Sequence, residues 1–270
     1  MTALTTTDPA QLVQITDTHL HGREGRTLLK MDTRKSLEQV LQLVSRNEGR
    51  PDFVLVTGDV AQDGSTAAYR QFLQQIATLD APFRWIPGNH DSPATMREID
   101  ATACGTELRI NNWFILFLDS SVEGKIHGEL SASQLEVLRQ RLAEIEADSL
   151  VDYCLICLHH NPVEGSAAWM QDIGLHRSRE FFSVIKNYPK VRCLIYGHIH
   201  QELDFSNQGI RCLCTPSTCI QFKPDVSDFT LDPLNPGYRS VRLYADGRID
   251  SRVHRIEGFA WVADFESPGY

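Results

Sequence analysis

Short and almost uninterrupted apolar runs recur along the first 200 residues of the chain and predict β-strands. In order, these runs are LVQIT (12–16), FVLVT (53–57), FRWI (83–86), WFILFL (113–118), YCLICL (153–158) and VRCLIY (191–196). Several are too uniformly apolar to face water, so we expect strands buried on both faces, as in layered α/β proteins.

Between these runs the apolar spacing changes to that of amphipathic helices. A third helix is indicated where Ser131 and Gln134 form a capping-box pair. The buried faces that this spacing predicts are Leu37, Val40, Leu41 and Val44; Tyr69, Phe72, Leu73 and Ile76; and, after the capping box, Leu135, Leu138, Leu142 and Ile145. Strand and helix therefore alternate, which favours sheets packed between helices.

The chain, 270 residues long, is predicted to form a single domain over residues 1–270, because no repeat or long linker divides it. From about residue 205 the pattern changes to strands and loops, with the runs IRCLCT, SVRLY and RIDSRV. We expect the Pro-rich stretch 216–236 to be an ordered loop tethered by Phe222, Phe229 and Tyr238. The aromatic C-terminus, with Phe259, Trp261 and Phe265, can pack on the chain's own core or on a partner, so the oligomeric state stays open.

Composition excludes some classes of protein. No apolar stretch reaches the ~20 residues of a membrane helix, and the N-terminal MTALTTTDPAQ lacks the features of a secretory signal. We therefore expect a cytoplasmic protein without a membrane partner. The net charge of −9 argues against a nucleic-acid partner, although metal ions can attract a small anionic substrate in spite of it.

Seven cysteines do not suggest a disulfide framework, because they lie on or beside apolar runs. Cys154 and Cys157 are three residues apart in a predicted strand and should point to opposite faces. Cys212 and Cys214 should share a face. We interpret all seven as buried thiols.

Polar residues with metal-binding side chains follow the predicted strands. Carboxyl ends of strands in an α/β sheet are where ligands gather, and oxygen and imidazole donors suit divalent ions. The candidates are Asp17 and His19, Asp59, Asn89, His159, and His198 with His200. Gly58, Gly88 and Gly197 directly precede three of them, where the missing Cβ permits close backbone approach.

Each candidate alone has an ordinary explanation as a turn former or helix cap. Isolated histidines such as His21, His127, His176 and His254 receive no role for the same reason. What distinguishes the set is the conjunction of D-x-H, G-D, G-N-H-D, a later His and G-H-x-H in that order. Such a set predicts a centre that hydrolyses a phosphate ester.

This order of motifs resembles that of the calcineurin-like metallophosphoesterases over residues 14–201. The stretches ITDTHL, TGDVAQD, PGNHD, HGELS, GHIHQELD and TPSTCIQFKP are further similar to the bacterial class III cyclic-nucleotide phosphodiesterases. The resemblance implies an α/β fold with four layers, an αββα sandwich of two mixed sheets flanked by helices. It also implies hydrolysis of 3′,5′-cyclic AMP, or cyclic GMP, to the 5′-monophosphate.

The resemblance implies two divalent metal ions, with iron or manganese favoured over zinc or cobalt. It places one ion on Asp17, His19 and His200. The other lies on Asn89, His159 and His198, and Asp59 bridges the two. Of the adjacent histidines, His159 is favoured as the ligand and His160 is a neighbour.

Two ions that share a water can supply a hydroxide and hold phosphate oxygens. The leaving oxygen needs a proton, and His90 is the candidate donor because imidazolium titrates near neutral pH. Asp91 is a candidate to orient His90 or is an ordinary turn carboxylate. We expect the substrate to lie against five residues of the motifs, which are His19, Asp59, Asn89, His90 and His200.

Three alternatives remain at this point. The same motifs serve enzymes that hydrolyse other small phosphodiesters or monoesters. A scaffold of the same fold without catalysis would be expected to have lost ligands, and all seven are present here. A structural zinc site favours Cys-rich sets.

Overall fold

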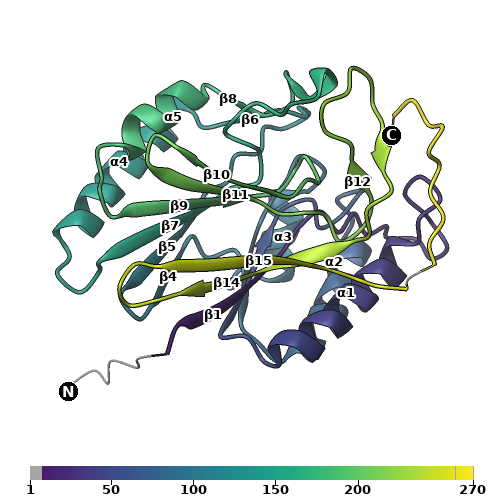
Figure 1. The fold of residues 1–270 in the computed structure, drawn as a ribbon, viewed down its shortest axis with the longest axis horizontal. Helices are drawn as coiled ribbons and strands as arrows, with labels where there is room; N and C mark the ends of the chain where they lie inside the picture. The colour runs from purple at the N-terminus through teal and green to yellow at the C-terminus, as the bar shows by residue number, and fades with distance from the viewer. Residues whose placement is uncertain (1–7, 259, 270) are drawn as a thin grey trace.

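A computed structural model describes residues 8–258 and 260–269 of the chain. Two β-sheets lie face to face in the middle of the molecule, with helices on both outer sides (Figure 1). Three separate apolar cores fill the spaces between successive layers. The predicted four-layer αββα sandwich is therefore confirmed.

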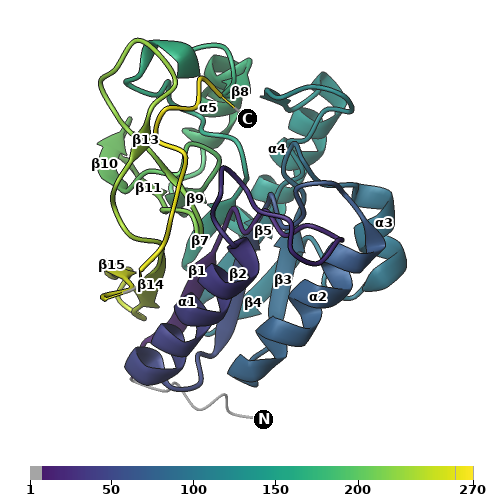
Figure 2. The same cartoon turned by 90° about the vertical axis from the view of Figure 1, so that its right-hand side faces the viewer.

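The first sheet has three parallel strands extended by two antiparallel strands from the C-terminal portion. In spatial order its strands are β15 (Ile249–Arg255), β14 (Gly237–Leu243), β1 (Ala10–Ile15), β2 (Phe53–Thr57) and β3 (Phe83–Ile86). Its outer face is covered by three helices, α1 (Thr33–Glu48), α2 (Thr66–Ile76) and α3 (Pro93–Ile99), two of which lie in the foreground of Figure 2.

The second sheet has four parallel strands between two antiparallel edge strands. In spatial order its strands are β10 (Leu203–Asn207), β11 (Ile210–Cys214), β9 (Val191–Tyr196), β7 (Tyr153–Cys157), β5 (Trp113–Phe117) and β4 (Glu107–Ile110). Its outer helices are α4 (Ala132–Ala147) and α5 (Ser178–Ile185). Smaller elements are β6 (Gly128–Glu129), β8 (Leu175–His176), β12 (Gln221–Phe222), β13 (Leu231–Asp232), η1 (Ala77–Leu79) and η2 (Ala168–Met170).

The predicted apolar runs form strands, and the predicted helical faces are buried on α1, α2 and α4 except for Leu73, which is partly buried. Both reciprocal hydrogen bonds of the capping box between Ser131 and Gln134 are present. Cys154 and Cys157 belong to different cores, while Cys212 and Cys214 share one, as predicted. The thiols are free; six are buried, and Cys104 is partly exposed, so the prediction of burial is wrong for that residue.

The Pro-rich stretch is an ordered loop that carries β12 and β13. The rings of Phe222 and Phe229 pack edge to face at 5.4 Å, and Tyr238 is fully buried. At the C-terminus, Trp261 packs on the chain's own core and donates a hydrogen bond to Asn235. Phe259 lies outside the described residues. None of the described helices has the length and apolar character needed to cross a membrane.

Candidate metal centre

The seven candidate ligands gather at one edge of the two sheets, where the loops after β1, β2, β3, β7 and β9 meet. Donor atoms of Asp17, His19 and His200 lie within 4.8 Å of one another. We call the seven residues the ligand cluster: Asp17, His19, Asp59, Asn89, His159, His198 and His200.

The backbone turns sharply at five members of this cluster. The φ angles are 54° at Asp17, 44° at His19, 48° at Asp59, 70° at His198 and 49° at His200. A positive φ is uncommon for residues other than glycine and costs about 1–2 kcal/mol each. Interstrand hydrogen bonds help to hold these turns, such as Asp17 N–H to the Gly58 carbonyl (3.0 Å).

Glycines leave the space that these turns require, as the sequence predicted. A Cβ at residue 88 would lie 2.1 Å from an Asp59 carboxylate oxygen, and one at residue 197 would lie 2.4 Å from an Asp17 oxygen. At Gly58, with a φ of 93°, a Cβ would lie 2.4 Å from Nδ1 of His159. A methyl group at any of these positions would displace a member of the ligand cluster.

The donor atoms form two groups with Asp59 between them. In one group, Nε2 of His200 lies 3.1 Å from Nε2 of His19 and 3.4 Å from Asp17 Oδ1. In the other, Nε2 of His159 lies 3.2 Å from Nδ1 of His198 and 3.3 Å from Asn89 Oδ1. Asp59 Oδ2 lies 3.3 Å from Nε2 of His159 and 3.8 Å from Nε2 of His19.

The four histidines of the cluster are oriented by acceptors on their outer sides. Each outer ring nitrogen faces an oxygen that can only accept a hydrogen bond, so it must carry the proton. These contacts are His19 Nδ1 to Gln62 Oε1 (2.6 Å), His159 Nδ1 to Thr57 O (2.8 Å), His198 Nε2 to Ile173 O (2.9 Å) and His200 Nδ1 to Ile220 O (2.8 Å).

When the four rings are neutral, as metal binding requires, their inner nitrogens therefore point their lone pairs at one another and at two buried carboxylates. Lone pairs at about 3 Å repel unless a cation or proton lies between them, and ligand atoms around a transition metal have this spacing. The donor set thus fits divalent cations on a physical criterion that is independent of motif order.

The charge states agree with this arrangement. Burial lowers the pKa of His19 and of His198 to about 3, so both are neutral ligands at neutral pH. Burial also disfavours charge on His159, but Asp59 and then Asp17 outweigh it and raise its pKa to about 9. Metal binding would have to displace that proton.

His90 and Asp91 lie beside the cluster with different surroundings. The His90 amide donates to Asp59 Oδ1 (2.9 Å), and its ring lies edge-on to His19 at 5.0 Å. Asp91 accepts hydrogen bonds from the amides of Val60, Ala61 and Gly88, and from the Tyr69 hydroxyl (3.0 Å). Asp91 therefore ties the loop after β3 to the loop after β2, and its action on His90 stays a prediction.

His160 is fully buried, and both of its ring nitrogens have protein partners. Nδ1 lies 2.8 Å from the Ser120 hydroxyl, and Nε2 donates to the Ile126 carbonyl (3.1 Å). These contacts favour His159 over His160 as the ligand. They give His160 the role of anchoring the loop before β6.

Exposure differs within the site. Of the seven ligands, Asn89 is partly exposed and the other six are buried; His90, next to Asn89, is also partly exposed.

Comparison with known proteins places this geometry in a family. Residues 10–202 match the model of the calcineurin-like phosphoesterases. The chain belongs to this family. Calcineurin-like phosphoesterases use a dinuclear metal centre, in agreement with the two groups of donors around Asp59.

Relatives within the family are similar over nearly their whole length. The chain is 42% identical to the 3′,5′-cyclic adenosine monophosphate phosphodiesterase CpdA of Pseudomonas aeruginosa, covering 96% of this chain and 94% of the relative. It is 41% identical to CpdA of Escherichia coli K12 with the same coverage. A 3′,5′-cyclic-nucleotide phosphodiesterase of Nostoc is 33% identical, covering 92% of this chain and 93% of the relative.

Solved structures share the fold at low sequence identity. A dimetal phosphatase from Danio rerio has a TM-score of 0.65 at 16% identity, covering 92% of this chain and 99% of its own. A purple acid phosphatase from yellow lupin has a TM-score of 0.64 at 13% identity, covering 93% of this chain and 54% of its own.

Sequence reasoning did not identify the groups that orient the histidines. Three are backbone carbonyls, which residue type cannot reveal. The fourth is the side chain of Gln62, which lies in the quoted stretch TGDVAQD. The sequence signal for a role of Gln62 beside the ligands was its position three residues after Asp59.

Proposed function

We propose that this protein hydrolyses 3′,5′-cyclic AMP to 5′-AMP at a dinuclear metal centre. The observation that supports the substrate most strongly is the 42% identity over 96% of the chain to a relative that bears this activity in its name. The seven donor side chains lie close together, which supports the location of the proposed metal centre.

Within this proposal, Asp17, His19 and His200 would hold one ion. Asn89, His159 and His198 would hold the other, and Asp59 would be available to both. The O/N donor set accepts iron and manganese, which we favour, as well as zinc and cobalt. When bound, the ions activate a water molecule and neutralise phosphate oxygens.

The protein's own groups position the substrate and supply a proton. The phosphate enters past Asn89 and His90 and lies against His19, Asp59 and His200. A water oxygen forms a bond to phosphorus as the bond from phosphorus to the 3′ oxygen breaks, and His90 donates a proton to that leaving oxygen. Asp59 holds the His90 backbone through the 2.9 Å hydrogen bond to its amide.

A substrate panel tests the proposal. Purified protein is given cyclic AMP, cyclic GMP, a glycerophosphodiester and p-nitrophenyl phosphate, and products are separated by chromatography. We expect cyclic AMP to be converted to 5′-AMP with the highest kcat/KM. Rapid cleavage of another ester without hydrolysis of cyclic AMP would contradict the proposal. Elemental analysis of protein purified without added metal identifies the ions.

A further inference from the structure

One buried histidine beside the ligand cluster has no part in the proposed chemistry. His160 follows the candidate ligand His159 in the loop after β7 and is fully buried. Its ring lies edge-on to the His159 ring at a centroid distance of 4.8 Å, and tilted against the His198 ring at 4.7 Å. Both neighbours are proposed ligands of the same ion, the one on Asn89, His159 and His198, which we call the second ion.

The contacts of His160 are confined to that side of the cluster. The other ion, which we call the first ion, is proposed on Asp17, His19 and His200. In the described part of the chain, the His160 ring makes no ring contact or hydrogen bond with any of these three residues. Any influence of the ring on metal binding should therefore differ between the two ions.

Both ring nitrogens of His160 have protein partners, so the ring itself is not a ligand. Nε2 faces the Ile126 carbonyl at 3.1 Å and must carry the proton, because a carbonyl oxygen only accepts. Nδ1 keeps its lone pair and accepts a hydrogen bond from the Ser120 hydroxyl at 2.8 Å. Together these two bonds fix the tautomer and the orientation of the ring.

The backbone of β6 packs closely on the same ring. A Cβ at residue 128 would lie 2.3 Å from Nδ1 of His160, so the strand can approach this closely only with glycine at that position. Gly128 is not among the residues with a positive φ angle. The glycine is therefore required by its contact with His160 and not by its backbone conformation.

Strand β6 also supports the acceptor that orients His198. The Gly128 amide donates to the Gly174 carbonyl at 3.2 Å, next to the parallel pairing of β6 with β8. Ile173, directly before Gly174, supplies the carbonyl that faces His198 Nε2 at 2.9 Å. The segment that holds His160 and the segment that orients His198 are thus bonded to each other.

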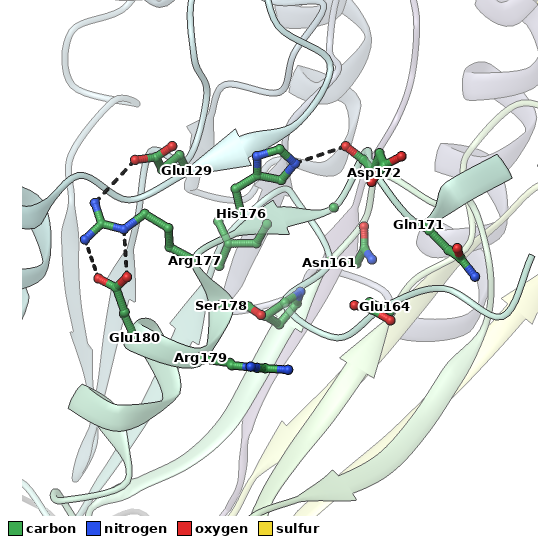
Figure 3. A pocket seen from close by; sticks show the side chains of 13 residues that line it. Glu129, Asn161, Glu164, Gln171, Asp172, His176, Arg177, Ser178, Arg179 and Glu180 are labelled. Atoms are coloured by element: carbon green, nitrogen blue, oxygen red, sulfur yellow. Dashed lines mark hydrogen bonds and ion pairs between the residues drawn. The ribbon is translucent and has the colours of Figure 1, made fainter. Parts of the chain in front are cut away.

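Charged side chains link the same two strands at the surface. Arg177, which follows β8, lies 3.4 Å from Glu129 of β6 and 2.9 Å from Glu180 of α5, as the dashed lines in Figure 3 show. The cavity in that view is lined by the loop after β7, by β8 and by the start of α5. These contacts hold β6 and β8 together on the side of His160.

We infer that His160 is a positioning residue for the second ion and not for the first. The inference rests on the metal centre of the proposed function. The ring limits the orientations open to His159 and His198, and its hydrogen bonds connect them to the loop before β6. Ligands that are already held in place lose less conformational freedom when an ion binds, so the affinity for that ion is higher.

Titration with Mn²⁺ alone tests the inference. Full-length protein is freed of metal with a chelator, and isothermal titration calorimetry of the wild type should resolve two binding steps. His198→Ala should abolish the step of the second ion and His200→Ala that of the first, which assigns the two steps. His160→Ala should weaken the second ion's step about 10- to 100-fold, the effect of losing an outer partner of a ligand. The first ion's step should not change, and excess Mn²⁺ should still fill both sites.

Gly128→Ala tests the same contact with the histidine in place. The added methyl group displaces the His160 ring, so the second ion's step should weaken about tenfold here as well. The conservative variant His160→Gln keeps a donor for the Ile126 carbonyl and should recover part of the affinity that His160→Ala loses.

His254→Ala is the matched control. Its ring nitrogens also have partners, in Ser240 at 2.9 Å and Asn47 at 3.3 Å, and its ring stacks on Tyr238, but none of these residues belongs to the ligand cluster. Both binding steps should be unchanged in this variant.

Three results would overturn the inference. They are an equal loss in both steps in His160→Ala, an unchanged second step, and abolition of that step as in His198→Ala, which would make His160 a ligand. In each case the wild-type protein still binds two ions, so the proposed metal centre stands. A wild-type protein that binds no Mn²⁺ would overturn the inference together with that metal centre.

Discussion

The ligand cluster and the cavity lined by the loop after β7, by β8 and by the start of α5 are built differently. Six of the seven ligands are buried, and five have a left-handed backbone. The cavity is lined largely by exposed polar side chains such as Gln171 and His176, and its buried members are Asn161, Pro162 and Leu175. The cluster has the fixed geometry that handling a phosphate requires, whereas the cavity wall can change its side chains without disturbing that geometry. Rigid, buried donors and an exposed, polar cavity wall thus belong to separate parts of the molecule.

Removal of the central charge of the cluster should have the largest effect. Asp59→Asn keeps an oxygen that can accept from the His90 amide but loses the charge between the two donor groups. We expect kcat/KM to fall at least about 10³-fold, and equally for cyclic AMP and for bis(p-nitrophenyl) phosphate. Metal content and activity are measured together, with exposed Asp80→Asn as control. A loss confined to cyclic AMP would argue against a role of Asp59 in handling the phosphate that both substrates share.

His90→Ala should come next. The proton for the leaving oxygen is lost, and kcat for cyclic AMP should fall about 10²- to 10⁴-fold with unchanged metal content. Nitrophenolate leaves without a proton, so the rate on bis(p-nitrophenyl) phosphate should fall much less. Full activity of the metal-loaded variant on cyclic AMP would show that His90 is not the donor.

Gln62→Leu tests the orientation of one ligand from outside the cluster. Gln62 is the one acceptor among the four that is a side chain, and without it the tautomer of His19 is no longer fixed. We expect the affinity for one metal ion to fall about 10- to 100-fold. Titration of the metal-free protein measures this affinity, and excess metal should restore activity. An unchanged affinity would mean that the backbone turn alone orients His19.

The stability of the metal-free protein should depend on pH through the buried histidines. His19 and His198 have a folded pKa of about 3 against about 6.5 unfolded, so stability is lost as the pH falls below about 6.5. His159, with a folded pKa of about 9, adds stability that is present below about 6.5 and is lost as the pH rises through 9.

From these three groups we expect the Tm of the metal-free protein to be highest near neutral pH and to fall by roughly 5 °C between pH 6.5 and 5. Differential scanning calorimetry with a chelator measures it. Metal-saturated protein should lack the decline at high pH, since the proton of His159 is displaced. Identical profiles with and without metal would argue against His159 as a ligand.

The difference between the buried ligand cluster and the exposed cavity wall also explains how much of the structure the sequence could predict. Buried parallel strands leave long apolar runs, and residues after those runs must meet at one edge, so the members of the cluster were identified before their geometry was known. Helix α5 was not predicted, because its eight residues are too short to show a helical period.

The left-handed turns at Asp17, His19, Asp59, His198 and His200 have a consequence for the exchange of metal ions. Because hydrogen bonds between loops help to hold these turns, the backbone itself sets the direction in which the donors point. Loading and replacement of an ion then require only its passage beside Asn89 and His90, not refolding of the strand ends. Ion exchange should therefore be much faster than global unfolding, and the metals found in the purified protein should follow those supplied during growth.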